Sequence, residues 1–325
     1  MGAAALLEAD GLRLSYTASI EATPAKPLPR EAREWGLAIS AYKSDPPVMD
    51  KSCYYLDSMP ASWRHGIYTA LGTRDLQKRS YLAIKASWTE FKYINHESGY
   101  PNMAQLAFTD MVLTGEHLTS AGDINTTLNY YNVLNFDEMR ADFLGAKFGI
   151  PQMFLPEIAR SVEGNKEKVS RIYSPEGIPA SEHVMGMAWV HDLEVYRAYM
   201  NWGPIDQSNH AKVAFGWDRD IEFTGDGEND DIIEISSDQS PVEVSVFKRP
   251  GKVVFVIMNN SDSDAKITIK PEWSKLGVNI PANLVDAYKE QALPAPDLAN
   301  VLVPVEGESA TFTVKARNFK ALAAR

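Results

Sequence analysis

The feature that most constrains the fold of this chain is an alternation, before residue 222, of short apolar strands with segments of helical periodicity. The predicted strands are Leu12–Ile20, Ser52–Asp57, Phe91–His96, a segment around Phe108 that runs from Leu106 through Leu113, and Ile150–Leu155. The predicted helices cover 62–87, 136–148 and 182–202. This alternation of strand and helix indicates βα units that build a parallel sheet. The sheet can be a (β/α)8 barrel or an open doubly wound sheet. We therefore expect an α/β region at 1–222.

Ionisable side chains recur where these predicted strands end. They are Asp57, His96, Asp110 and Glu157. In a barrel this edge of the sheet is the active-site face, and in an open sheet it is the ligand edge. A single carboxylate at a strand end is commonly a helix cap or an ion-pair partner, but the repetition favours a site of carboxylates and histidines.

Two carboxyl groups that flank one bond, one protonated and one ionised, can hydrolyse a glycoside. Asp57 ends an apolar strand, where burial and neighbours can set its pKa. Asp110 and Glu116 straddle a strand end and a glycine, so both can face one pocket. The sequence therefore predicts Asp57, Glu116 and Asp110 as catalytic candidates.

Other chemistries have weaker signals. The pairs His96–Glu97, Glu116–His117 and His191–Asp192 suggest a metal site, but there is no H-E-x-x-H or H-x-H motif. His191 and Asp192 are equally explained as buried polar groups of an apolar helix. There is no G-x-S-x-G elbow, phosphate loop or dinucleotide fingerprint. We predict no cofactor, and a metal-dependent hydrolase or lyase is kept as an alternative.

Composition and net charge limit the classes of molecule that this chain can bind. The chain has 325 residues, 45% of them hydrophobic and 23% charged, with a net charge of −11 and one cysteine, Cys53. These values exclude dominant disorder and a disulfide framework, and they disfavour nucleic acid as a ligand. No run of 18 apolar residues exists to span a membrane. Seven tryptophans and 14 tyrosines fit either sugar stacking, with Trp35 or Trp63 as a platform, or an aromatic core.

A change of pattern follows the acidic linker at 225–231. Val242–Phe247 and Lys252–Met258 are predicted strands joined by a turn at Arg249-Pro250-Gly251. Asp264–Lys270 and Thr311–Lys315 also alternate. We expect an antiparallel β-sandwich domain at 231–325.

The N-terminal segment Ala3–Asp10 has the pattern of a helix end stopped by Gly11. It has neither the basic region nor the apolar length of a secretory signal, so localisation is left open. A chain that starts inside a helix is expected to be N-terminally truncated.

A series of motifs in order carries a family resemblance. The motifs are Tyr54–Asp57, Arg74–Arg79, Asn95–Gly99, Phe108–Asp110 with Gly115–His117, Phe136–Phe143, Gly149–Glu157 and Gly186–Asp192. Together they resemble a family of bacterial glycoside-hydrolase-like proteins with a (β/α)8 barrel and a C-terminal β-sandwich. That family is distantly similar to retaining α-N-acetylgalactosaminidases.

The resemblance implies a retaining glycosidase with Asp57 as nucleophile and Glu116 as acid/base, although Asp110 could take either role. His96, His117, Arg140 and Glu157 would hold the hydroxyls of a carbohydrate substrate. The chain departs from the family in one respect: we count five barrel strands, whereas a (β/α)8 barrel has eight. An incomplete barrel leaves unpaired edges, through which the chain could self-associate, and a non-catalytic carbohydrate-binding or scaffold protein is the second hypothesis.

Overall fold

The structure of this chain is a computed structural model with two compact units. It describes residues 7–9, 12–14, 38–39, 53–56, 74–75, 77–79, 81–82, 85, 92–96, 106–115, 118, 133–143, 146–147, 149–158, 166–217, 220–292 and 294–325. The first unit is Met1–Thr114 with Phe148–Met153, and the second is Gly115–Lys147 with Phe154–Arg325. Within the described ranges, no helix combines the length and the apolar character needed to cross a bilayer.

A parallel sheet organises the first unit. Strands β4 (Cys53–Leu56), β5 (Lys92–His96) and β6 (Met111–Thr114) pair in parallel, and β8 (Ile150–Phe154) follows β6 in the sheet. Leu56 lies opposite Asn95, and His96 lies opposite Leu113, so the three carboxyl ends are nearly level. The α/β content and the parallel sheet that the sequence predicts are confirmed.

The N-terminal prediction is wrong in the described residues. Leu7–Ala9 is strand β1, not a helix end, and it pairs antiparallel with β2 (Leu12–Leu14) and β3 (Ala38–Ile39). Leu12–Leu14 therefore belongs to a separate sheet. The physical reason is local: Ala9 pairs with Leu12, and the two residues between them are Asp10-Gly11, a sequence that favours two-residue hairpin loops.

Three further elements differ from expectation. The helix predicted at 136–148 is α4 (Phe136–Phe143), and Ala146–Lys147 is strand β7 rather than part of that helix. The strand predicted at Leu106–Leu113 is shifted, because residues 107–110 form turns and a bend before β6 begins. Of the helix predicted at 182–202, the part up to Val190 is helical and belongs to α6 (Ile178–Val190). Residues 191–201 form turns and strand β9 (Glu194–Val195), and α7 (Trp202–Phe215) begins where the predicted helix ends. Asp192 adopts a left-handed φ of 54°, so the helix cannot continue past it.

The remaining short elements complete the order. They are α4 (Phe136–Phe143), β7 (Ala146–Lys147), α5 (Lys166–Tyr173), the 3₁₀ turns Pro175–Gly177 and Leu298–Asn300, β9 (Glu194–Val195), α8 (Trp273–Leu276) and α9 (Ala287–Glu290).

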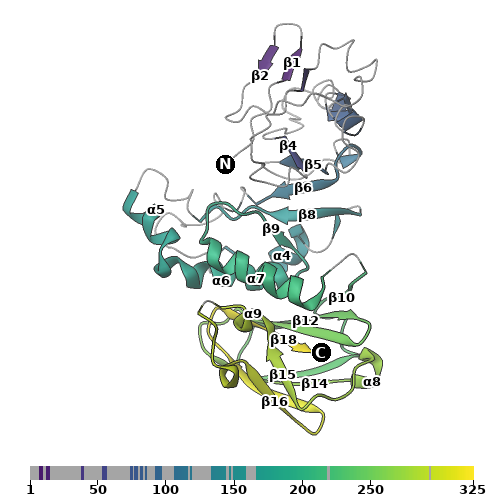
Figure 1. Cartoon of the computed structure of the whole chain (residues 1–325), viewed down its shortest axis with the longest axis vertical. Coiled ribbons are helices and arrows are strands. Elements are labelled where there is room, and N and C mark those ends of the chain that lie inside the picture. The colour runs from purple at the N-terminus through teal and green to yellow at the C-terminus, as the bar shows by residue number, and fades with distance from the viewer. Residues whose placement is uncertain are drawn as a thin grey trace. The chain divides into compact units, whose positions relative to one another are not determined.

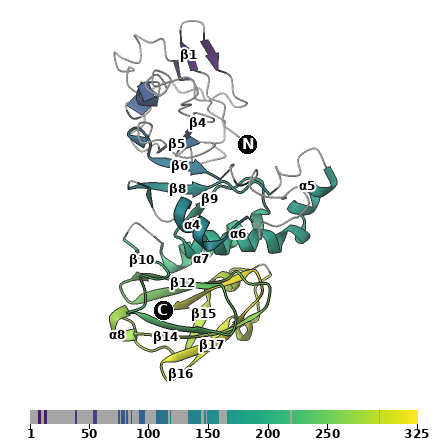
Figure 2. The ribbon, with the colours of Figure 1, turned by 180° about the vertical axis from the view of Figure 1, so that it is seen from behind.

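A large curled antiparallel sheet dominates the C-terminal part (Figures 1 and 2). In sheet order its strands are β10 (Glu222–Thr224), β12 (Val242–Arg249), β13 (Lys252–Asn259), β18 (Asn318–Ala324), β15 (Asn283–Asp286), β16 (Leu302–Glu306), β17 (Ser309–Val314), β14 (Ala265–Pro271) and β11 (Ile233–Ser237). The predicted hairpin at Gly251 joins β12 to β13, and this glycine has the positive φ of 75° that the turn needs.

Strand β13 is buried on both faces. Val253, Phe255 and Ile257 point into the core inside the curled sheet. The alternate residues Val254, Val256 and Met258 belong to a second core shared with α6 and α7, and Figure 1 shows these helices against the sheet. A strand covered on both faces needs a continuous apolar run, and β13 has one.

Candidate functional site

The carboxyl edge of the parallel sheet is the site that the sequence predicts. Of its described members, His96 is the last residue of β5 and Glu157 follows β8, and both are buried with 2% of their surface exposed. Asp57, Glu116, His117, Trp35 and Trp63 lie outside the described residues.

Gly115 fixes how the chain leaves β6. Its φ is +143°, and a Cβ there would lie 2.4 Å from the carbonyl oxygen of Leu155 and 2.9 Å from the ring of Phe154. Only glycine fits such a close approach without movement of the backbone. The residue before Glu116 is thus set tightly against the segment that leads to Glu157.

Asp110 lies at the opposite end of its strand from the predicted one, because β6 begins after it. Its carboxylate accepts a hydrogen bond from the backbone N–H of Tyr93 (2.8 Å) and pairs with the ammonium of Lys85 (2.6 Å). Its own N–H donates to the carbonyl of Tyr93 (2.9 Å). These contacts attach the start of β6 to β5.

Arg140 lies on α4 and contacts the curled sheet. Its Nη1 pairs with Oε1 of Glu243 on β12, and its Nη2 lies 2.9 Å from Oδ1 of Asp137. The start of α4 is capped by Asn135, whose side-chain oxygen accepts the N–H of Glu138 (2.8 Å). The structure therefore places Arg140 as a bridge from α4 to β12.

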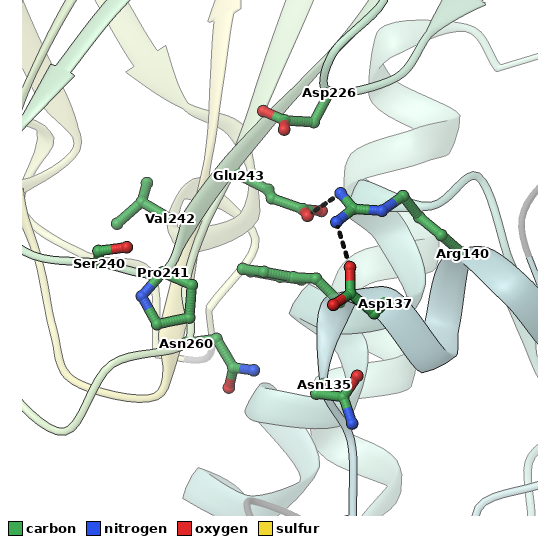
Figure 3. Close-up of a pocket in the computed structure, with 10 residues that line it drawn as sticks. Asn135, Asp137, Arg140, Asp226, Ser240, Pro241, Val242, Glu243 and Asn260 are labelled. Carbon is green, nitrogen blue, oxygen red and sulfur yellow. Dashed lines mark hydrogen bonds and ion pairs between the residues drawn. The ribbon is translucent and has the colours of Figure 1, made fainter.

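A pocket of about 350 Å³ opens beside this bridge. Figure 3 shows the guanidinium of Arg140 between the carboxylates of Asp137 and Glu243. The residues that line the pocket are Asn135, Phe136, Asp137, Arg140, Asp226, Ser240, Pro241, Val242, Glu243 and Asn260.

Glu243 is the most perturbed carboxyl group around this pocket. Burial raises its pKa to about 7, against the opposing effect of Arg140 and with help from the charge of Asp226. Its Oε2 lies 3.5 Å from Nε2 of His191. No sequence motif marks Glu243; the available signal is a glutamate inside the apolar strand Val242–Phe247.

The tautomer of His191 follows from its other contact. Nδ1 lies 2.7 Å from the carbonyl oxygen of Met187, which can only accept, so Nδ1 carries the hydrogen. Burial lowers the pKa of His191 to about 4, so the ring is neutral and Nε2 is an acceptor facing Glu243. A protonated Glu243 can therefore donate to His191, whereas an ionised one pairs with Arg140 alone.

Metal ligands are not grouped in the part of the chain that the structure describes: no three His, Cys, Asp or Glu side chains there could hold an ion. The contacts of His191 support its interpretation as a buried polar group.

Comparisons with known proteins return structures only. No family model and no curated protein matches the chain. Among similar solved structures are a maltogenic α-amylase from Thermotoga neapolitana (11% identity, TM-score 0.42, covering 84% of this chain and 60% of that one) and a GH30 endoxylanase from Clostridium papyrosolvens (11%, 0.45, 86% and 67%). An α-amylase from Lactobacillus plantarum is similar at 9% identity and a TM-score of 0.45, covering 84% and 62%.

These similar structures are glycoside hydrolases, and this chain spans about 60% of the first one's length. At such identities and scores we transfer no residue role from them.

Proposed function

We propose that this chain is a retaining glycoside hydrolase acting on a glycan or oligosaccharide, distantly similar to retaining α-N-acetylgalactosaminidases. In this proposal residues 1–222 contain the partial (β/α)8 barrel and residues 231–325 form the β-sandwich, one face of which shares a core with helices between residues 136 and 215. Asp57 is the nucleophile and Glu116 the acid/base.

The register of the parallel sheet is the observation that supports this assignment best. Leu56 lies opposite Asn95, and His96 lies opposite Leu113. Asp57 is the next residue after Leu56, and Glu116 is two residues past the end of β6. Carboxyl ends of parallel strands meet at one edge of a sheet, which is where barrel enzymes hold their catalytic groups.

In the proposed reaction, the carboxylate of Asp57 attacks the anomeric carbon while the protonated carboxyl of Glu116 gives its proton to the leaving oxygen. A covalent glycosyl-enzyme forms. Glu116, now ionised, takes a proton from water, which displaces Asp57 from the anomeric carbon. This chemistry places the two carboxyl groups about 5–5.5 Å apart.

The substrate-binding part of the proposal keeps His96, His117 and Glu157 for the sugar hydroxyls, and Trp35 or Trp63 for stacking. Arg140 fits the bridge to Glu243 better than it fits a sugar contact. Likewise, the contacts of Asp110 with Lys85 and the Tyr93 N–H favour Asp57 and Glu116 over it as catalytic groups.

A panel of α- and β-aryl glycosides, with and without a chelator, tests the proposal. We expect turnover of at least one member, unchanged by the chelator. Asp57→Asn should lower kcat by about 10⁴-fold or more. Glu116→Gln should lower kcat/KM by about 10²–10⁴-fold on glycosides with poor leaving groups, and much less on dinitrophenyl glycosides, whose leaving group needs no proton.

The two roles are separated by azide. With Asp57→Ala, azide replaces the nucleophile and gives a glycosyl azide of inverted configuration. With Glu116→Ala, azide attacks the covalent intermediate and gives the retained configuration, and NMR distinguishes the products. Asp110→Asn is the matched control, with turnover largely kept. A folded Asp57→Asn variant with full activity would contradict the assignment.

A further inference from the structure

Two aromatic rings touch each other on the surface of the second unit. Tyr173, the last residue of α5, and Trp202, the first of α7, are 44% and 51% exposed. Their ring centroids are 6.3 Å apart, with an angle of 74° between the planes. Among the residues that the structure describes, these are the exposed aromatic members of the large hydrophobic set.

A buried polar residue fixes this pair in place. Asn201, which precedes Trp202, caps α7 and donates from Nδ2 to the carbonyl of Ser174 (2.9 Å), the residue after Tyr173. The N–H of Asn201 donates to the hydroxyl of Ser181 (2.9 Å), which is fully buried. The end of α5 and the start of α7 are thus joined by hydrogen bonds, so the two rings are held in position before any ligand arrives.

One charged pair lies at the ring of Trp202, and a second pair lies close in sequence to Tyr173. The guanidinium of Arg197 lies over one face of Trp202, 4.7 Å from the ring centroid, and pairs with Asp206 (2.6 Å), so a ligand would stack on the other face of this ring. Arg171, on the same helix as Tyr173, pairs with Glu176 (2.6 Å). All four charged side chains are about half exposed. The surface therefore offers a small apolar centre with hydrogen-bonding groups at Trp202.

The size of this surface indicates what it can bind. An aromatic side chain presents roughly 150–250 Å², so the exposed parts of the two rings amount to about 200 Å². A stable protein interface buries about 800 Å² on each partner. A pyranose ring, by contrast, has one apolar face of C–H groups and a rim of hydroxyls, which matches an aromatic centre bordered by Arg and Asp.

We propose that Tyr173 and Trp202 form a carbohydrate-binding platform that stacks a pyranose ring of a polysaccharide, with Arg197 and Asp206 bonding its hydroxyls. The ligand class rests on the proposed function of this chain. The platform adds a binding site to that function, and the sequence did not predict either residue.

Affinity electrophoresis through gels that contain soluble starch, xylan or mixed-linkage β-glucan tests this. The protein carries Asp57→Asn so that no glycan is cleaved during the run. We expect at least one polysaccharide to retard it. Trp202→Ala should raise the dissociation constant tenfold or more, while Trp202→Phe, which keeps a flat ring, should raise it less. Val213→Ala, which truncates a 76%-exposed residue of the same helix, is the control and should change nothing.

Several outcomes would overturn the platform. They are no retardation by any of the three polysaccharides, equal retardation of the Trp202→Ala variant, and a change of oligomeric state on Trp202→Ala without an effect on retardation. Circular dichroism and the Tm check that the variants are folded. If Trp202→Ala alone does not fold, the comparison of Tyr173→Ala with Tyr173→Phe decides, with binding lost in the first and kept in the second.

Aryl-glycoside turnover separates this inference from the proposed function. Retardation that depends on Trp202, in a chain that turns over no aryl glycoside, would support the platform and contradict the proposed enzyme activity. Turnover of aryl glycosides, with retardation that does not depend on Trp202, would support the enzyme activity and contradict the platform.

Discussion

Glu243 is a carboxyl group between two different neighbours, a guanidinium on one oxygen and a neutral imidazole near the other. Its side chain is 6% exposed, so burial outweighs the attraction of Arg140 and the pKa rises to about 7. Because an unfolded glutamate ionises near pH 4.5, the folded chain holds a proton here that the unfolded chain has lost over the window from about 4.5 to 7. The stability contributed by this group is therefore lost as the pH rises through that window.

Glu243→Gln should remove this pH dependence. Relative to the variant, the native chain should lose on the order of 2–3 kcal/mol of unfolding free energy between pH 5 and pH 8. Denaturant melts at both pH values measure it. Glu222→Gln, at an exposed glutamate paired with Lys248 on a neighbouring strand, is the control. An equal pH dependence in Glu243→Gln and the native chain would show that Glu243 titrates normally.

At the scale of residues, local signals in the sequence were predictive, and contacts between distant residues were not. The positions of His96 and Glu157 at strand ends were predictable because each lies where an apolar run ends, which is a local signal. Glu243 and Trp202 were missed because their significance depends on partners distant in sequence, His191 for the first and Tyr173 for the second. Asp110 was misplaced because a strand boundary differed by a few residues from the predicted one, and this moved it to the other edge of the sheet.

At the scale of elements, α6 packs directly on the curled sheet through a glycine. A Cβ on Gly186 would lie 2.6 Å from Sδ of Met258 and 2.8 Å from Cβ of Phe319, so the helix approaches β13 and β18 more closely than alanine permits. α6 is buried on nearly every side, as expected of a helix that is apolar all round.

Gly186→Ala should therefore destabilise the chain even though alanine favours helix formation. Overpacking of this kind costs about 1–3 kcal/mol. Thermal or denaturant unfolding measures the loss. Gly225→Ala is the control, because the nearest atom to its added Cβ, on Phe223, lies at an ordinary 3.4 Å. Unchanged stability of Gly186→Ala would mean that the helix can shift without loss.

Elements that the local sequence determines were predictable, whereas a helix break that depends on tertiary contacts was not. The β12–β13 hairpin follows from two apolar runs on either side of a turn and from Gly251, whose positive φ is available to glycine. The break between α6 and α7 depends on the left-handed backbone of Asp192 and on the cap at Asn201, within a segment that has continuous apolar periodicity. Such a break is decided by tertiary contacts rather than by propensity.

At the scale of the whole molecule, the second unit contains two apolar cores that share one sheet. One core lies inside the curl of the sheet, and the other lies between the sheet and helices α4 to α7. The domain boundary predicted between residues 222 and 231 passes through the second core. The sheet residues that contribute to it are Phe247, Val254, Val256, Met258, Phe319, Ala321 and Ala323.

A fragment of residues 231–325 should therefore not behave as an independent domain. Without the helices, its β12–β13–β18 face presents these buried side chains to water, and apolar faces of that extent lead to association. A fragment of residues 115–325, which keeps α4 to α7, should unfold cooperatively as a monomer. Light scattering, dye binding to exposed apolar surface and thermal melts compare the two. A monomeric 231–325 fragment that binds no dye and melts cooperatively would show that the inner core alone sustains the sheet, and the predicted boundary would then be a true domain boundary.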